Sequence, residues 1–306
     1  MNNIINVNEL THDYGHGRGV FEVSFNVGDG ETLGFLGPNG AGKSTTMRHL
    51  MGFSKPQSGK VEINGLNCTK EHNKIMQSVG YLPGEVSLPE GLNGYQFIKM
   101  MQDMKKSKND DRVRYLLDKF ELDPSGSVKR MSIGEKRKLA VVTAFMNDPD
   151  ILLLDEPTSG LDPIMQETFI DFIKEEKQRG KSILLSSHIF SEVEALCDRI
   201  AIIKDGRLIS SVDAAQIKHG LHNIMTVEFD DPKDFADFGR SELDFKLRDR
   251  STLKCAVVVD DEDINKFISV IRKFKIKAFS EHSVTLEEYF MHFYKNDRSF
   301  GGVSYA

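Results

Sequence analysis

Short apolar runs alternate with amphipathic stretches through the first two thirds of the chain. The runs at residues 32–36, 151–156 and 181–188 predict buried strands, and residues 43–52, 134–146 and 162–180 have helical spacing. Asp162 and Pro163 are suited to begin the last of these helices. Strands without a polar face must be covered on both sides, so the pattern predicts an α/β fold with a largely parallel sheet.

Two further patterns refine this architecture. Residues 60–65 read as a strand, residues 198–211 as a hairpin turning at Asp205 and Gly206, and residues 95–122 as helical. Near residue 220 the order becomes strand, helix, strand, strand, helix, strand, which matches a ferredoxin-like unit. We expect a first domain at 1–218, with a helical subdomain at about 86–145, and an accessory α+β domain at 219–306. An amphipathic helix at 285–296 ends the pattern.

Composition and charge narrow the class of protein. The formal net charge is −6, which offers no bulk footprint for nucleic acid, so we expect no nucleic-acid partner. The N-terminus lacks the pattern of a secretory signal, and the longest nearly apolar run, 139–146, is far too short to cross a bilayer. Three separated cysteines, Cys68, Cys197 and Cys255, form no CxxC and predict reduced thiols in the cytoplasm.

The stretch GPNGAGKST at residues 37–45 follows a predicted buried strand and opens a predicted helix. It fits the P-loop pattern, in which glycines and a helix N-terminus turn backbone N–H groups toward phosphates. A lysine here reaches the β- and γ-phosphates, and the serine hydroxyl ligates Mg²⁺. The predicted nucleotide-binding residues are Gly37, Asn39, Gly40, Ala41, Gly42, Lys43, Ser44 and Thr45.

Two acids, Asp155 and Glu156, end the apolar run ILLLDE. A central strand places them at the carboxyl edge of the sheet, beside the P-loop. Asp155 is suited to hold Mg²⁺, mostly through water, and Glu156 to polarise an attacking water as general base. The alternative is a pair of capping or solvated acids.

The P-loop and the acid pair are followed by further motifs in a characteristic order. Through these motifs the chain resembles the ATP-binding-cassette (ABC) ATPases over about residues 3 to 215. MSIGE at 131–135 is similar to the signature LSGGQ: Ser132 and Gly134 match, whereas Ile133 and Glu135 depart. SGLD at 159–162 looks like the D-loop ending in Asp162. His188 looks like the switch histidine that contacts the γ-phosphate, and Tyr14 like the aromatic residue that stacks on adenine.

The resemblance implies two ATPs, with Mg²⁺, sandwiched in a head-to-tail dimer. Ser132, Gly134 and Glu135 of one subunit would then face the ATP on a second ABC subunit, in a homodimer or a heterodimer. ATP would close the dimer and hydrolysis would release it. A P-loop GTPase or kinase is the alternative, but the chain lacks an NKxD motif, and the signature and D-loop would be left unexplained.

The C-terminal part resembles cassettes of ABC-2-type exporters of drugs, antibiotics or peptides, through the ending SVTLEEYFMHFY at 283–294. That resemblance implies a separate transmembrane permease and a cytoplasmic position at the inner face of the cell membrane. A soluble ABC ATPase regulating translation or DNA metabolism is the alternative. Such proteins usually have two cassettes or a long coiled-coil insertion, and this chain has neither.

One motif departs from the family. The Q-loop is usually YLPQ, with a glutamine that contacts Mg²⁺ and water, but here Gly84 follows Tyr81, Leu82 and Pro83. Glu85 comes next and carries a carboxylate, a good Mg²⁺ ligand. Two hypotheses remain open: Glu85 replaces the glutamine, or it is a solvated acid or permease contact.

Overall fold

A computed structural model describes residues 3–106, 108–218, 223–259, 263–282, 286–287, 290–291, 299–300 and 303–304. The chain divides into two compact units, Met1–Ser211 and Val212–Ala306, so the division precedes the boundary expected at residue 218. Among the described residues, no helix combines the length and apolar character needed to cross a membrane. All three cysteines are buried free thiols.

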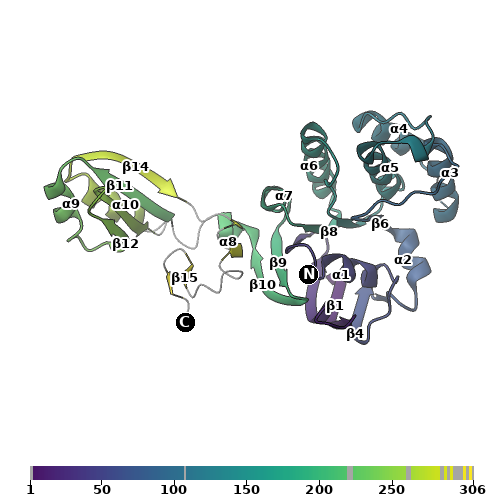
Figure 1. The fold of residues 1–306 in the computed structure, drawn as a ribbon, viewed down its shortest axis with the longest axis horizontal. Coiled ribbons are helices and arrows are strands. Elements are labelled where there is room, and N and C mark those ends of the chain that lie inside the picture. Colours follow the sequence, from purple (N-terminus) through teal and green to yellow (C-terminus); the bar gives the residue numbers. More distant parts are fainter. Residues whose placement is uncertain are drawn as a thin grey trace. The chain divides into compact units, whose positions relative to one another are not determined.

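The first unit is built on a six-stranded sheet in the order β10-β9-β3-β8-β7-β6 (Figure 1). Its strands are β10 (Arg207–Asp213), β9 (Arg199–Lys204), β3 (Thr32–Leu36), β8 (Ser182–Ser187), β7 (Ile151–Asp155) and β6 (Val79–Leu82). The pairs from β9 to β6 are parallel, which confirms the predicted parallel core. The predicted turn between β9 and β10 is confirmed, with Asp205 and Gly206 both at positive φ.

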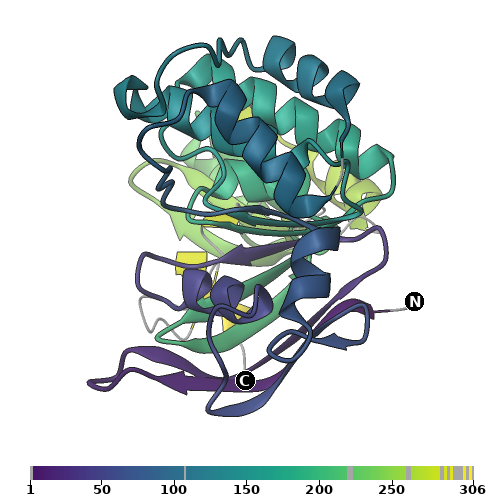
Figure 2. The same ribbon diagram turned by 90° about the vertical axis from the view of Figure 1, so that its right-hand side faces the viewer.

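An antiparallel sheet lies below this core (Figure 2). It has the order β2 (Gly19–Gly28), β1 (Asn3–Asp13), β4 (Ser58–Ile63) and β5 (Leu66–Asn67). Only β4 was predicted from the sequence. Buried residues of both sheets form one core with α1 (Lys43–Leu50) and α2 (His72–Ser78). Leu153 of β7 belongs to this core, whereas its neighbours Leu152 and Leu154 point to the opposite face.

Helices cover that opposite face (Figures 1 and 2). They are α3 (Gly94–Lys105), α4 (Asp110–Lys119), the 3₁₀ turn η1 (Val128–Arg130), α5 (Ile133–Phe145), α6 (Pro163–Gln178) and α7 (Phe190–Leu196). The Asp162 side chain accepts from Met165 N at 3.0 Å and Pro163 is the first helical residue, so the predicted start of α6 is confirmed. Aromatic contacts among Phe120, Phe145, Phe169 and Phe172 join α4, α5 and α6.

The second unit begins with α8 (Ala214–Lys218) and contains an antiparallel sheet in the order β12-β13-β11-β14. Its elements are β11 (Asn223–Phe229), α9 (Pro232–Phe238), β12 (Asp244–Asp249), β13 (Lys254–Val259), α10 (Ile264–Ile271) and β14 (Ile276–His282). Val227, Cys255 and Val257 pack with Phe238 and Phe267 of the two helices, so both helices cover one face. This order of strands confirms the ferredoxin-like prediction.

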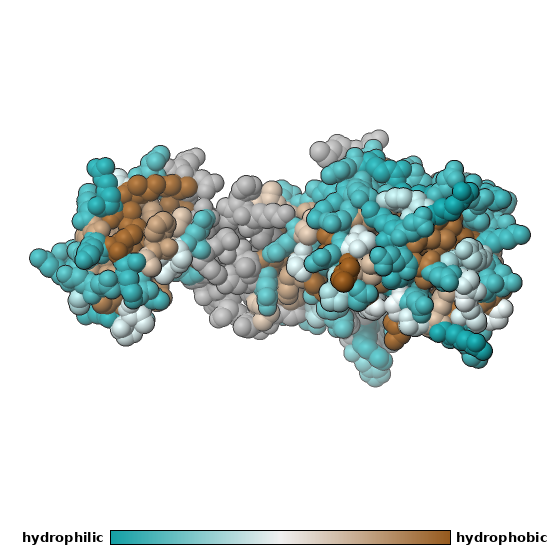
Figure 3. Space-filling view, turned by 90° about the horizontal axis from the view of Figure 1, so that it is seen from above, coloured by the Kyte–Doolittle hydropathy of each residue, from teal (hydrophilic) through white to brown (hydrophobic). Residues whose placement is uncertain are grey.

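The end of the chain is described only in part. The short strands β15 (Ser299–Phe300) and β16 (Val303–Ser304) form a pair. The helix predicted at 285–296 lies largely outside the described residues. The second unit exposes the side chains of Leu247, Ile268 and Phe279. Hydrophobic residues also gather on the face of this unit that Figure 3 shows on the left.

Candidate active site

The P-loop connects β3 to α1, as the sequence predicts. Gly42 has φ +108°, and a Cβ there would lie 2.7 Å from Val20 Cγ1, so this position requires glycine. Nζ of Lys43 donates to the carbonyls of Gly37 at 2.6 Å and Pro38 at 3.2 Å. Of the other predicted residues, Asn39, Gly40 and Ser44 are exposed, Thr45 is half-buried and Ala41 is buried.

Glu156 follows β7 and lies between two other predicted site residues. Its Oε1 is 3.0 Å from Nζ of Lys43, and its Oε2 is 2.6 Å from Nδ1 of His188. Its backbone has φ +47°, and its N–H donates to the Ser186 carbonyl at 3.0 Å. The structure therefore brings the P-loop lysine, the acid after β7 and the histidine after β8 together.

Asp155 is buried at the end of β7 and accepts a hydrogen bond at Oδ1 from the Ser186 hydroxyl. Its Oδ2 faces Gly84, where a Cβ would be only 3.1 Å away. The described residues hold no group of three or more His, Cys, Asp or Glu suited to a metal. One carboxylate and the Ser44 hydroxyl fit Mg²⁺, which keeps several waters and binds through few protein ligands plus phosphates.

Gly84 and Glu85 follow β6 and differ in their surroundings. Gly84 lies against Asp155, so the loop approaches the carboxylate through its backbone. Glu85 is exposed, and its carboxylate has no hydrogen-bond or ion-pair partner in the described part of the chain. The two hypotheses for Glu85 therefore remain predictions.

Arg137 on α5 was not predicted as a site residue. The side chain is 2% exposed, and its guanidinium donates to carbonyls of the loop after β6, of the end of β7 and of the segment after β7. Burial lowers the pKa of Arg137 to about 10, so it stays charged at neutral pH. Arg137 is the middle of three consecutive basic residues, Lys136, Arg137 and Lys138, and nothing in the sequence distinguishes it from its neighbours.

Glu192 on α7 was also missed. The buried carboxylate accepts from the Ser187 hydroxyl at 2.8 Å and from the Thr158 hydroxyl. Burial raises its pKa above the usual value. Glu192 therefore links the residue before His188 to the segment that follows Glu156.

The predicted signature lies at the start of α5. The Ser132 hydroxyl accepts from Glu135 N at 3.2 Å, and the Glu135 carboxylate accepts from Ser132 N at 2.7 Å, which forms a capping box. That bond lowers the pKa of Glu135. A Cβ at Gly134 would lie 3.4 Å from the Gly160 carbonyl, so the signature and the D-loop are neighbours.

Tyr14 follows β1 and is half-exposed. Its ring centroid is 4.5 Å from that of His12, which is 4.9 Å from that of the buried His49 on α1. Nε2 of His49 lies 3.2 Å from Nδ1 of His12. Burial lowers the pKa of His49, which favours the neutral imidazole. A chain of rings thus connects Tyr14 to the helix that begins at Lys43.

An apolar groove of about 320 Å³ lies beside the loop after β6. We call it the loop groove and define it by Phe53, Met76, Tyr81, Pro83, Leu88 and Met101. Lys105 also lines it and donates to the Val79 carbonyl at 2.8 Å, and burial lowers its pKa. Pro83 places this groove next to the turn that touches Asp155.

Known proteins are similar to this chain in sequence. A family model described as ABC transporter matches residues 20–159. The uncharacterized ABC transporter ATP-binding protein YhcH of Bacillus subtilis is 37% identical over 217 residues, 68% of this chain and 70% of that protein. The bacitracin transport ATP-binding protein BcrA of Bacillus licheniformis is 36% identical over 223 residues, 71% of this chain and 72% of that protein.

A solved structure has the same fold. The ATP-binding subunit of an ABC transporter superposes with a TM-score of 0.66 and 30% identity, covering 70% of this chain and 92% of that chain. The sequence relatives and the solved structure therefore indicate the same family. The chain belongs to the ABC transporter family, as an ATP-binding subunit.

Proposed function

We propose that the chain binds and hydrolyses ATP as the ATPase subunit of a bacterial ABC exporter. The observation that carries the proposal is the position of Glu156, with one carboxylate oxygen 3.0 Å from Lys43 Nζ and the other 2.6 Å from His188 Nδ1. An acid held between a P-loop lysine and a histidine is placed to orient a water near a bound γ-phosphate.

Each residue has a separate role in this proposal. The P-loop N–H groups and Lys43 bind the phosphates, and Tyr14 stacks on adenine. Glu156 accepts a proton from the attacking water, and His188 donates to the γ-phosphate. Ser44 and Asp155 would hold Mg²⁺, which neutralises phosphate charge.

Two exposed isoleucines support a dimer formed through the signature and the D-loop. Ile133 is 78% exposed within the signature, and Ile164, just after Asp162, is 72% exposed. Large apolar side chains beside the signature and the D-loop are suited to burial against a second subunit. We propose that Ser132, Gly134 and Glu135 face the nucleotide of that subunit, of the same or a related chain.

The loop groove supports a permease as the second partner. It is apolar, open to the surface and walled by the loop that touches Asp155, so a cytoplasmic segment of a membrane protein bound there would lie close to the site. We propose that a separate permease holds the chain at the inner face of the cell membrane. The likeness to the bacitracin transport protein supports export of a drug, antibiotic or peptide.

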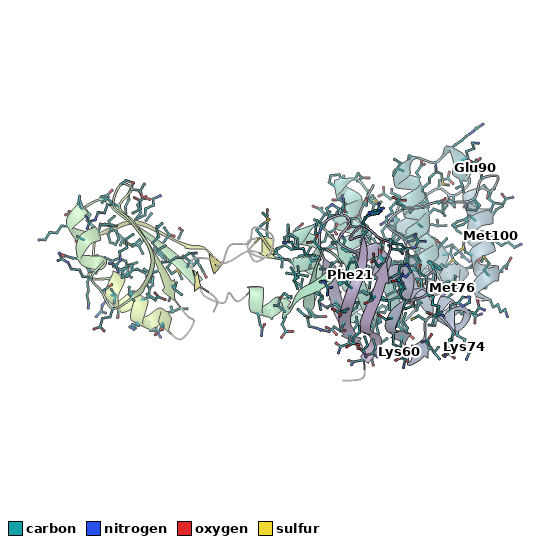
Figure 4. All side chains as sticks on the ribbon, turned by 60° about the horizontal axis from the view of Figure 1, so that its bottom comes forward. Phe21, Lys60, Lys74, Met76, Glu90 and Met100 are labelled. Atoms are coloured by element: carbon teal, nitrogen blue, oxygen red, sulfur yellow. The ribbon has the colours of Figure 1, made fainter. Side chains whose placement is uncertain are left out.

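Co-expression tests this assembly. We expect the full chain in the membrane fraction only when a permease encoded by a neighbouring gene is also expressed. Met76→Glu should release it because the charge enters the loop groove, whereas Met100→Glu, which is on α3 but does not line the loop groove, should not (Figure 4). Membrane binding without any permease, or stable binding to ribosomes instead, would contradict the exporter and favour a soluble regulator.

A further inference from the structure

We propose that Arg137 is a positioning residue for hydrolysis, which fixes the backbone of Gly84 and of Glu156 in one arrangement. This inference rests on the proposed ATP hydrolysis at the same site. It assigns to one buried side chain on α5 the task of holding the loop after β6 against the end of β7.

The hydrogen bonds of Arg137 account for all of its donors. Nε donates to the Pro157 carbonyl at 2.9 Å, and Nη2 to the carbonyls of Asp155 at 3.1 Å and Glu156. Nη1 donates to the carbonyls of Gly84 at 3.3 Å and Pro83. A guanidinium has five N–H groups in a rigid planar fork, and here each has a carbonyl.

Such an arrangement is costly unless every bond is made. A buried charged group without partners is strongly destabilising. Here carbonyls accept the hydrogen bonds of the guanidinium, and the nearby carboxylates of Asp155, Glu156 and Glu192 favour its charged form. The carbonyls come from two segments that are far apart in the sequence. The guanidinium is therefore stable in this place only while both segments keep their present positions.

Both segments contain atoms of the site. The Glu156 peptide is held at its N–H by the Ser186 carbonyl and at its carbonyl by Arg137, so its carboxylate is aimed between Lys43 and His188. Gly84 has no side chain with which to hold itself, and its Cα faces the Asp155 carboxylate. Arg137 supplies the attachment that residue 84 cannot make.

Arg137→Lys tests the role because it keeps the charge but has donors on a single nitrogen, which cannot span both segments. We expect kcat for ATP to fall at least about tenfold, because small displacements of catalytic groups have large effects. The Kd for a fluorescent ATP analogue, measured with and without Mg²⁺, should change less than about threefold, because the P-loop is intact. Hydrogen exchange should rise in residues 83–90 and stay unchanged in α1.

Arg112→Lys is the matched control. Arg112 is a largely buried arginine whose Nη2 lies 2.6 Å from Oε1 of Glu176, and it contacts neither segment. Arg112→Lys should lower the melting temperature without changing kcat or the hydrogen exchange of residues 83–90. Arg137→Met, which removes the charge as well, should lower kcat at least as much as Arg137→Lys.

Two results would overturn the proposal: an unchanged kcat in Arg137→Lys, or equal losses of kcat, nucleotide binding and melting temperature in Arg137→Lys and Arg112→Lys. Failure of the unaltered protein to hydrolyse ATP would instead contradict the proposed function. In that case the exchange of residues 83–90 still tests whether Arg137 holds the loop.

Discussion

Nδ1 of His188 lies 2.6 Å from Oε2 of Glu156, although β7 and β8 deliver the two residues from separate parts of the chain. The short contact makes Nδ1–H of His188 the donor, because the carboxylate only accepts. While this bond is made, His188 donates to a bound γ-phosphate only with a second proton, on Nε2. With Lys43 at the other oxygen, Glu156 has a defined direction in the site.

Glu156→Gln should separate binding from hydrolysis. The amide keeps the shape of the side chain but cannot accept a proton from water, so we expect phosphate release to fall by about 10²- to 10⁴-fold. ATP binding should persist, and gel filtration with ATP should show a stable dimer. Glu175→Gln, an exposed acid on α6, is the control with normal turnover. Undiminished phosphate release in Glu156→Gln would remove Glu156 from the role of base.

Gly84→Ala should lower hydrolysis, because the added Cβ would lie 3.1 Å from Oδ2 of Asp155 and force the loop or the carboxylate to move. We expect a fall in kcat of about fivefold or more, with weaker dependence of nucleotide binding on Mg²⁺. ATP turnover measures the first effect, and the Kd of an ATP analogue with and without Mg²⁺ measures the second. Turnover equal to that of the unaltered protein would show that this close approach is irrelevant to the site.

Glu85→Ala discriminates the two hypotheses for this acid. Its carboxylate is exposed and has no partner in the described part of the chain, whereas Gly84 faces Asp155. We therefore expect basal ATPase activity within about twofold of normal, since exposed side chains without contacts have small effects. The same variant should lose stimulation by the permease in membranes. Loss of basal activity would instead support Glu85 as a Mg²⁺ ligand.

Patterns that depend on neighbours in the sequence were predicted well, and contacts between distant segments were not. The apolar run of β7, the P-loop glycines and the Asp162 cap each have a local signal, and their places in the fold were correct. Strand β1 mixes polar and apolar residues and has register shifts near Leu10, which break the alternation. Arg137 and Glu192 become site residues only because folding brings carbonyls and hydroxyls around them.

Asp148→Asn should reduce stability in a pH-dependent way. Hydrogen bonds from Arg179, and to a lesser extent from Lys181, hold the pKa of Asp148 in the folded protein below its usual 3.8. The Asp148 carboxylate therefore stabilises the fold above pH 3.8, and this stabilisation is lost as the pH falls toward the lowered pKa of the folded protein. The side chain is 34% exposed, so we expect a loss of about 1 kcal/mol in the free energy of unfolding at pH 7.

Urea denaturation of both proteins at pH 7 and pH 3 measures this difference. Asp171→Asn is the control, since Asp171 pairs with Lys174 on the exposed surface of α6, and its effect should be smaller. If the free energies of unfolding of Asp148→Asn and the unaltered protein differ by the same amount at both pH values, the pKa of Asp148 is not lowered by folding.

Glu192→Gln should show the opposite dependence. Burial raises the pKa of Glu192 above its usual 4.5, so the native state keeps this proton to a higher pH than the unfolded chain does. From pH 4.5 up to the raised pKa, the unaltered protein therefore loses stability relative to the glutamine variant, and below pH 4.5 the difference is constant. Free energies of unfolding at several pH values from 4 to 8 measure this stability difference.

Glu175→Gln is the control, and its stability difference should change with pH in the opposite direction, because Lys119 lowers the pKa of Glu175. If the stability difference between Glu192→Gln and the unaltered protein changes with pH in the same direction as that of Glu175→Gln, burial is not the main influence on the pKa of Glu192.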